Sequence, residues 1–263
     1  MTVTSQIKNI VPNSVKKLYH DLRYSLQPKY VLTESLYVGT KKNYRSAIPA
    51  RIYFNKATPL CHLMKRYGSD KGLYSGFSRH NYTTVYNALF SPMKDRAKRV
   101  FELGIGTTNT NITSHMGATG IPGASLRAWA EYFFNAEIFS ADIDKDILFQ
   151  TNRITTFYCD QTDITSIKQL WSQPVLLMPF DIIIDDALHE FEANSLFLEA
   201  SLDKLKPGGF YIIEDVLTSA LPRWKHHVAE MMRSKPEFNA VIIQLPNRYN
   251  NWDNNLVIFE KLS

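Results

Sequence analysis

The segment Val100–Gly106 constrains the fold of this chain most, because it reads as a buried strand that ends in a glycine turn. Later apolar runs also end in acidic residues, namely Asp142, the pair Asp185-Asp186 and the pair Glu214-Asp215. Carboxylates that follow parallel strands lie along one edge of the sheet, in the crevice where open α/β folds bind ligands. The sequence therefore predicts an α/β fold with a cofactor site at that edge and a catalytic site beside it.

Strands and helices are predicted to alternate, as in a mostly parallel sheet covered on both faces. The predicted strands after 99–103 are 137–141, 155–159, 180–184 and 210–213. The predicted helices are 60–67, 80–90, 124–134, 146–152, 164–173, 192–205 and 222–233, with a long polar loop at 107–123 and a turn at 206–209. Residues 239–245 and 256–262 read as two strands with no room for a helix between them, so we expect an antiparallel pair that closes the sheet.

The first 56 residues differ in charge from the rest of the chain. They hold ten Lys and Arg residues against two acids, a net charge of +8, whereas residues 57–263 carry a net charge of −3. Their apolar spacing predicts a basic amphipathic helix at 14–26, followed by extended or irregular structure at 27–56. We therefore expect a basic N-terminal arm at 1–56 and one catalytic domain at 57–263, with the arm contacting another subunit, an acidic partner or an anionic membrane surface. Its aromatic and basic character favours a homo-oligomer.

Composition excludes several classes of protein. No apolar run approaches the roughly 20 residues of a membrane helix, and no secretory signal is visible, so the expectation is a cytoplasmic protein without stable membrane insertion. Cys61 and Cys159 are far apart and are expected to be free thiols. Because the positive charge belongs to the arm and forms no stripe in the catalytic body, no nucleic-acid partner is expected.

The glycine turn is typical of several cofactor sites, and three details favour S-adenosylmethionine (SAM) over a dinucleotide. Asn109 occupies the position of the last glycine in the dinucleotide fingerprint. Glu102 precedes Gly104 by two residues, as is favoured for the amino-acid end of SAM. The following strand ends in Asp142, which suits two ribose hydroxyls.

Residues 60–260 together resemble the mycinamicin- and macrocin-type sugar O-methyltransferases and related enzymes of bacterial polysaccharide clusters. The motifs that carry the resemblance are FELGIG, PGASLRAW, SADID, CDQTD, IIDDALH and LKPGGFYIIED. The implied fold is a class I methyltransferase sheet, mostly parallel with an antiparallel last strand. The implied cofactor contacts are Glu102, Gly104 and Gly106 at the methionine part, Asp142 at the ribose, and Asp160 and Gln161 at the adenine.

The resemblance also implies a divalent metal, with Mg²⁺ as the expected ion. Methyl transfer to a sugar hydroxyl requires that the hydroxyl be aligned and lose its proton, and a metal aids both. The implied ligands are Asp186, Glu214 and Asp215; the catalytic residues are Asp186 and His189, the base. Asp185 is expected on the cofactor side, and Lys71, His80 or Tyr82 in the cofactor pocket or its lid.

Alternative interpretations stay open at this stage. Asp160 could cap a helix or lie in solvent, His189 could cap or start the next helix, and the pair Glu214-Asp215 could cap the helix near Pro222. The expected acceptor is a sugar-containing small molecule or a surface-polysaccharide precursor. A phosphoryl or phosphoramidate acceptor in capsule synthesis, or a non-catalytic SAM-binding scaffold, are the alternatives.

Overall fold

The structure is a computed structural model that describes residues 30–32, 47–49, 51–53, 57–72, 80–247 and 250–263. The amphipathic helix predicted at 14–26 lies outside the described residues. Two short strands precede the main domain, β1 (Tyr30–Leu32) and β2 (Arg51–Tyr53), and they pair antiparallel. Ile48 and Ile52 are buried in the same core cluster as the first helices of the domain, so this part of the N-terminal region packs on the catalytic body.

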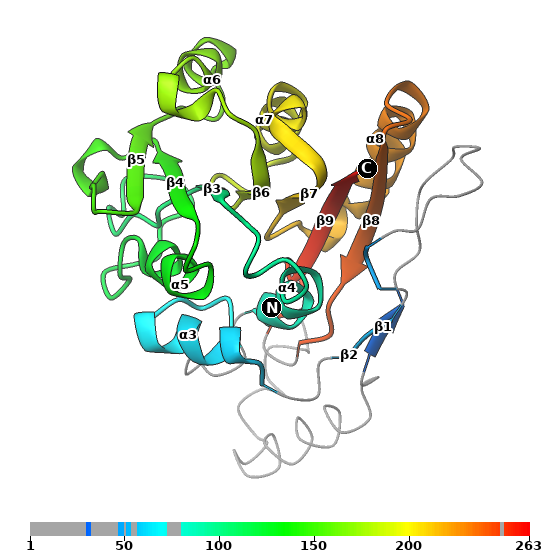
Figure 1. The fold of residues 1–263 in the computed structure, drawn as a ribbon, viewed down its shortest axis with the longest axis horizontal. Coiled ribbons are helices and arrows are strands. Elements are labelled where there is room, and N and C mark those ends of the chain that lie inside the picture. The colour runs from blue at the N-terminus through cyan, green and yellow to red at the C-terminus, as the bar shows by residue number, and fades with distance from the viewer. Residues whose placement is uncertain (1–29, 33–46, 50, 54–56, 73–79, 248–249) are drawn as a thin grey trace, which may run out of the picture.

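A seven-stranded sheet forms the centre of the domain, in the order β5-β4-β3-β6-β7-β9-β8 (Figure 1). Strand β9 runs antiparallel to both of its neighbours, and the other pairs in the sheet are parallel. This is the predicted class I methyltransferase arrangement with a reversed last strand. The strands are β3 (Arg99–Leu103), β4 (Glu137–Asp142), β5 (Ile154–Tyr158), β6 (Phe180–Asp185), β7 (Leu205–Ile213), β8 (Phe238–Gln244) and β9 (Asn255–Lys261).

Helices cover both faces of the sheet (Figure 1). One core cluster joins the sheet to α3, α4 and α5, and the other joins it to α6, α7 and α8. Within the described part of the chain, no helix is both long and apolar enough to cross a membrane. The helices are α3 (Pro59–Tyr67), α4 (Tyr82–Phe90), α5 (Ala124–Tyr132), α6 (Ile164–Trp171), α7 (Phe191–Ser201) and α8 (Leu221–Ser234).

Side-chain alternation along β3 decides where its acid points. Phe101 and Leu103 belong to the cluster with α6, α7 and α8, whereas Val100 belongs to the opposite cluster. Because successive side chains of a strand point to opposite faces, Glu102 lies on the face covered by α4 and α5. The pleat therefore directs this carboxylate into the core and towards α5.

Two predicted elements differ from the structure. The helix predicted at 146–152 is wrong: only one 3-10 turn forms, at Lys145–Ile147. The backbone N–H and C=O of Phe149 bond the hydroxyl of Thr156 at 2.6 and 2.7 Å, so these groups are satisfied without a helix. The turn predicted at 206–209 lies within β7, because β7 begins at Leu205, which pairs with Phe180 before the register shifts.

The turn after β3 requires glycine at its first position. Gly104 has φ +95°, and a Cβ there would lie 2.0 Å from the carbonyl oxygen of Asp186. The end of β6 therefore passes directly against the turn after β3, and this contact fixes how closely the two strand ends approach.

We expect Gly104→Ala to prevent folding or to lower the free energy of unfolding by about 3 kcal/mol or more, since a backbone clash adds to left-handed strain. Gly117→Ala is the matched control, because Gly117 has φ +77° with open space around it. It should cost only about 1–2 kcal/mol. Urea unfolding measures the free energy of unfolding of both variants. Equal losses would contradict the conclusion that contact with the Asp186 carbonyl requires glycine at position 104.

Candidate active site

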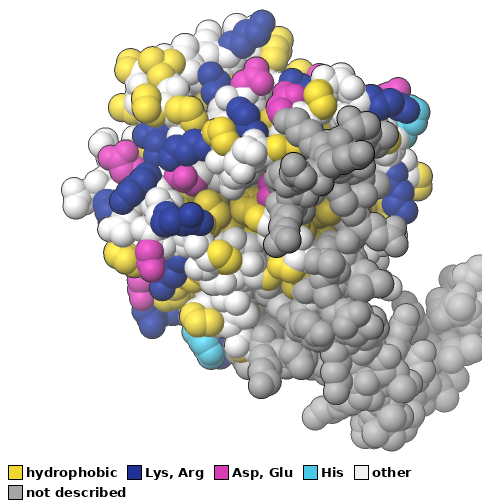
Figure 2. Space-filling view, turned by 45° about the vertical axis from the view of Figure 1, so that its right-hand side comes forward, with side chains coloured by type: hydrophobic (Ala, Val, Ile, Leu, Met, Phe, Trp, Pro, Cys, Tyr) yellow, Lys and Arg dark blue, Asp and Glu magenta, His cyan; other side chains and the backbone are white. Residues whose placement is uncertain are grey.

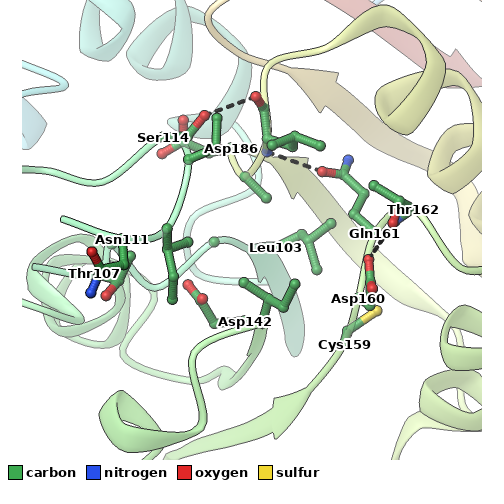
Figure 3. Close-up of a pocket in the computed structure, with 17 residues that line it drawn as sticks. Leu103, Thr107, Asn111, Ser114, Asp142, Cys159, Asp160, Gln161, Thr162 and Asp186 are labelled. Carbon is green, nitrogen blue, oxygen red and sulfur yellow. Dashed lines mark hydrogen bonds between the residues drawn. The ribbon is translucent and has the colours of Figure 1, made fainter. Parts of the chain in front are cut away.

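A cavity of about 360 Å³ opens at the carboxyl edge of the sheet. It lies over the ends of β3, β4, β5 and β6 and is bordered by the loop after β3 (Figure 3). Its volume is within the usual range for a small-molecule or cofactor site. The lining residues are Leu103, Gly104, Gly106, Thr107, Asn111–Ser114, Asp142, Ile143, Cys159–Thr162 and Asp186–Leu188. On the described face in Figure 2, Lys and Arg side chains lie interspersed with acidic and apolar ones.

Asp142 connects the cavity to the glycine turn. Its carboxylate accepts hydrogen bonds from the backbone N–H of Ile105 at 2.7 Å and of Asp144 at 2.9 Å. Burial raises the pKa of Asp142, and the backbone donors oppose that rise. Gly104, Gly106 and Asp142 all line the cavity, so three residues predicted for the cofactor are brought together.

Gln161 lies in the wall of the cavity and joins two strand ends. Its amide Nε2 donates to both oxygens of Asp185 at 2.8 Å. Its Oε1 accepts from the backbone N–H of Leu188 at 3.1 Å (Figure 3). Asp185 is fully buried beneath the cavity and also accepts from Asn194. Burial raises the pKa of Asp185 to about 7, against these amide donors. Asp185 therefore does not line the cavity and reaches it through Gln161.

Asp160 lines the cavity but also stabilises its own turn. Its Oδ1 accepts from the backbone N–H and the hydroxyl of Thr162, at 2.8 and 2.7 Å. Helix α6 begins after Asp163, so Asp160 is not its cap.

Lys71 places one ammonium group among three buried carboxylates. Its Nζ donates to Asp186 and to Glu214, the latter at 2.6 Å, and lies 3.7 Å from Glu102. Burial alone would lower the pKa of Lys71, but the carboxylates outweigh it and hold this pKa well above its usual value. Lys71 and Tyr82 lie beside the acids rather than in the wall of the cavity. Lys71 thus links the acid of β3 to the acids that follow β6 and β7.

Glu102 and Glu214 are held from their other side by aromatic and hydroxyl donors. Glu102 accepts from Ser125 at 2.6 Å and from the indole N–H of Trp129, and Glu214 accepts from the hydroxyl of Tyr86. Burial raises the pKa of both carboxyl groups, although Lys71 opposes the rise. Both carboxylates are therefore held between Lys71 and the donors of α4 and α5.

His189 faces two carboxylates at the open end of the cluster. Its Nε2 lies 3.2 Å from Oδ1 of Asp186 and 3.5 Å from Oδ2 of Asp215. Burial would lower the pKa of His189, but these two carboxylates raise it to about 9. Tyr82 donates to Asp215 at 2.6 Å, and His80 lies 3.2 Å from the same oxygen.

The backbone at the cluster excludes the two helix-cap alternatives. Helix α7 begins after Glu190, and helix α8 begins after Ala220. His189 and Asp215 have backbone φ values of +63° and +52°, which residues other than glycine rarely adopt. Strained conformations of this kind cluster at functional sites, and here they turn both side chains towards Asp186.

The donor set fits a divalent cation. Asp186, His189 and Asp215 each offer one ligand atom, and these atoms lie within 4.8 Å of one another. Carboxylate oxygens and imidazole nitrogens are ligands that divalent cations accept, and the cluster holds four carboxylates around one ammonium group and two imidazoles. Glu214, the third predicted ligand, is bonded to Lys71 and Tyr86 instead.

Sequence patterns did not identify several residues of the site. Tyr86, Ser125 and Trp129 hold the buried acids, and Ser114 in the long loop donates to the carbonyl of Leu188 at 2.8 Å (Figure 3). The helical pattern of α4 and α5 marks the aromatic residues only as core. The length of the loop was the one signal that pointed to Ser114.

We expect Lys71→Met to lower the free energy of unfolding by about 3 kcal/mol or more at pH 8, since removing one partner leaves buried carboxylates unpaired. The loss should shrink towards pH 5, because the acids whose pKa values burial raises then take up protons. Urea unfolding at both pH values tests this. Lys168→Met, at an exposed position of α6, should change stability by less than about 0.5 kcal/mol. If Lys71→Met lost no free energy of unfolding, or the same amount at both pH values, the pairing of Lys71 with ionised carboxylates would be contradicted.

Comparisons with known proteins identify sugar O-methyltransferases among the relatives. The chain is 33% identical over 166 residues to a rhamnosyl tetracenomycin-C 2'-O-methyltransferase of Streptomyces olivaceus, covering 63% of this chain and 40% of that protein. It is 33% identical to demethylmacrocin O-methyltransferase of Streptomyces fradiae over 55% of this chain and 34% of that protein. It therefore spans well under half the length of these curated relatives. No protein-family model matches the chain.

Solved structures support the fold. MycE methyltransferase from the mycinamycin biosynthetic pathway, solved with Mg and SAH, superposes with a TM-score of 0.58 at 24% identity, over 79% of this chain and 55% of that one. Its complex with Mg, SAH and mycinamycin VI gives a TM-score of 0.55 at 22% identity, over 80% of this chain and 56% of that one. The comparisons therefore confirm both predictions from the sequence: this chain has the class I methyltransferase fold and is related to the macrocin- and mycinamicin-type sugar O-methyltransferases.

Proposed function

We propose that this protein transfers the methyl group of SAM to a hydroxyl group of a sugar-containing acceptor. The observation that carries the proposal is that the cofactor-sized cavity and the cluster of Asp186, His189 and Asp215 share the same strand ends. Asp186 belongs to both, since it lines the cavity and faces His189. A cofactor in the cavity would therefore end beside a base and a pair of carboxylates.

The cavity suits SAM in size and in polar groups. Gly104 and Gly106 line it, and Asp142 has acceptor capacity for ribose hydroxyls beyond its two backbone donors. Asp160 and Gln161 would border the adenine. Glu102 would serve the methionine end together with Lys71, the cation beside it. SAM supplies a methyl group on a positively charged sulfur, which is the electrophile of the reaction.

The proposed reaction forms a bond between the acceptor oxygen and the methyl carbon while the sulfur–methyl bond breaks. The products are the methyl ether, S-adenosylhomocysteine and one proton. His189 would take that proton on its neutral imidazole, and the carboxylates of Asp186 and Asp215 beside Nε2 would stabilise the imidazolium. Tyr82 would hold Asp215 in place through its hydrogen bond at 2.6 Å.

A divalent cation such as Mg²⁺ would be held by Asp186 and Asp215, with Glu214 as the third predicted ligand. When bound it would lower the pKa of a coordinated hydroxyl and fix its direction. Glu214 would have to exchange its contact with Lys71 to take part. The MycE structures that share the fold were solved with Mg, which supports this proposal.

The names of the relatives favour a small-molecule glycoside as acceptor, because they describe methylation of a rhamnosyl tetracenomycin-C and of an olivosyl-oleandolide. We infer that residues 57–263 form the methyltransferase domain and that the basic residues 1–56 form an arm for a second subunit. A surface-polysaccharide precursor is the other sugar-containing acceptor that the proposal covers. A phosphoryl acceptor is the alternative that an acceptor screen would decide.

We expect His189→Gln to lower the rate of methyl transfer by about 10²–10⁴-fold with SAM affinity unchanged, because a positioned base is lost while the cofactor wall stays intact. His226→Gln is the control, since that side chain is 74% exposed on α8. Incubation with methyl-deuterated SAM and a panel of rhamnosyl and other deoxysugar glycosides, followed by mass spectrometry, measures the transfer. Full activity in His189→Gln would remove the base assignment.

The rate should rise with pH as His189 loses its proton. The pKa of about 9 means that in the metal-free protein the ring is mostly protonated at pH 7, and only the neutral ring can accept a proton. Bound cations near the ring would shift the midpoint of this rise below 9. A pH–rate profile between pH 6 and 10 checks this, and a rate that falls through the same range would contradict it.

A further inference from the structure

Two exposed apolar side chains lie on two segments beside the acid cluster. Trp252 in the β8–β9 connection is 52% exposed, and Leu217, two residues after Asp215, is 43% exposed. Large apolar side chains that stay exposed close to polar catalytic groups are typical of ligand-binding surfaces. Neither residue lines the cofactor cavity, so a cofactor there would leave them uncovered.

Hydrogen bonds join the two segments that carry these residues. The backbone N–H of Thr218 donates to the carbonyl of Trp252 at 2.5 Å, and its hydroxyl donates to the carbonyl of Asn251 at 3.2 Å. The N–H of Val216 donates to the carbonyl of Asn255 at 3.2 Å. The segment that follows the acids of β7 therefore runs alongside the loop that carries Trp252.

The same loop is tied directly to the acid cluster. The hydroxyl of Tyr82 lies 2.6 Å from Oδ1 of Asp215 and 3.2 Å from the carbonyl oxygen of Asp253. Trp252 directly precedes Asp253, and consecutive Cα atoms are about 3.8 Å apart. The backbone that carries Trp252 is therefore joined to Asp215 through the single hydroxyl of Tyr82.

Three buried asparagines fix the loop in this position. Asn250 and Asn254 are each 1% exposed, and Asn255 is 4% exposed. Asn254 donates to Asn81 at 2.8 Å, and Asn255 donates to the carbonyl of Val216 at 2.6 Å. The Oδ1 of Asn250 accepts from the backbone N–H of Trp252 at 3.2 Å and from that of Asp253 at 3.3 Å, so these backbone groups are satisfied without burying the indole ring. The backbone of Trp252 is therefore held in place, and its ring is open to solvent.

We propose that Trp252, with Leu217 beside it, forms the platform on which the sugar ring of the acceptor stacks. A pyranose ring has a face of C–H groups, which an indole can cover, and hydroxyls around its rim, which could turn to His189 and Asp186. Burying apolar surface on both partners favours this contact, and a rigid aromatic side chain loses little conformational entropy on binding. The inference rests on the proposed sugar methyl transfer and assigns specificity to a residue outside the cofactor and metal sites.

Ligand-observed NMR on the full chain with S-adenosylhomocysteine tests the platform, using methyl α-L-rhamnopyranoside and methyl β-D-glucopyranoside as probes. Trp252→Ala should weaken binding of a sugar probe about fivefold to tenfold, the size expected for one aromatic contact. Trp252→Phe should recover most of that affinity. Leu177→Ala is the control, because this side chain is 60% exposed and precedes β6, whereas the acid cluster follows the opposite end of that strand. Affinity for S-adenosylhomocysteine and the melting temperature should not change.

Each outcome decides between the platform and the proposed function. Sugar bound equally by wild type and Trp252→Ala would overturn the platform while leaving sugar methylation in place. Probes bound by neither protein, with S-adenosylhomocysteine still bound, would overturn both the sugar acceptor and the platform. A loss in Trp252→Ala that Trp252→Phe does not recover would exclude stacking as the cause.

Discussion

The contact of Lys71 with Glu102, Asp186 and Glu214 is the interaction on which the rest of the site depends. It brings acids from three neighbouring strand ends to one buried ammonium group. Charges at this depth are tolerated only when they are paired and hydrogen-bonded. The aromatic residues of α4 and α5 meet that requirement from the other side, since Tyr86 and Trp129 donate to the same carboxylates. The same residues therefore balance the charges of the site and pack one face of the core.

This arrangement separates two chemical environments across one carboxylate. Asp186 offers one oxygen to the closed side, where Lys71 binds it, and the other to the open side, where His189 faces it. On the closed side the neighbouring acids are fixed, and on the open side the imidazole and Asp215 remain partly accessible. Charge can then develop at the open side during a reaction while the buried side stays balanced. The positive φ values of His189 and Asp215 direct their side chains to that opening.

The sheet and much of the site were predictable from sequence because both follow local patterns. Apolar runs that end in acids marked the strands, and the polar link between 239–245 and 256–262 marked the hairpin. The helix predicted at 146–152 failed because the hydroxyl of Thr156 satisfies the backbone of Phe149, a partner that no spacing reveals. Lys71 was placed only near the cofactor, because its role depends on three acids that are 31, 115 and 143 residues away in sequence. The platform residues Leu217 and Trp252 carry no motif and become visible only through their exposure and neighbours.

Calorimetric titration of SAM into the wild-type protein and Asp142→Ala tests the central claim most directly. The wild type should show one saturable binding event, since the cavity holds one ligand of this size. Asp142→Ala should lose about tenfold or more in affinity, because two ribose contacts and the anchor of the glycine turn disappear together. Absence of binding to the wild type, or equal affinity in both proteins, would contradict the assignment of this cavity to the cofactor and with it the proposed reaction.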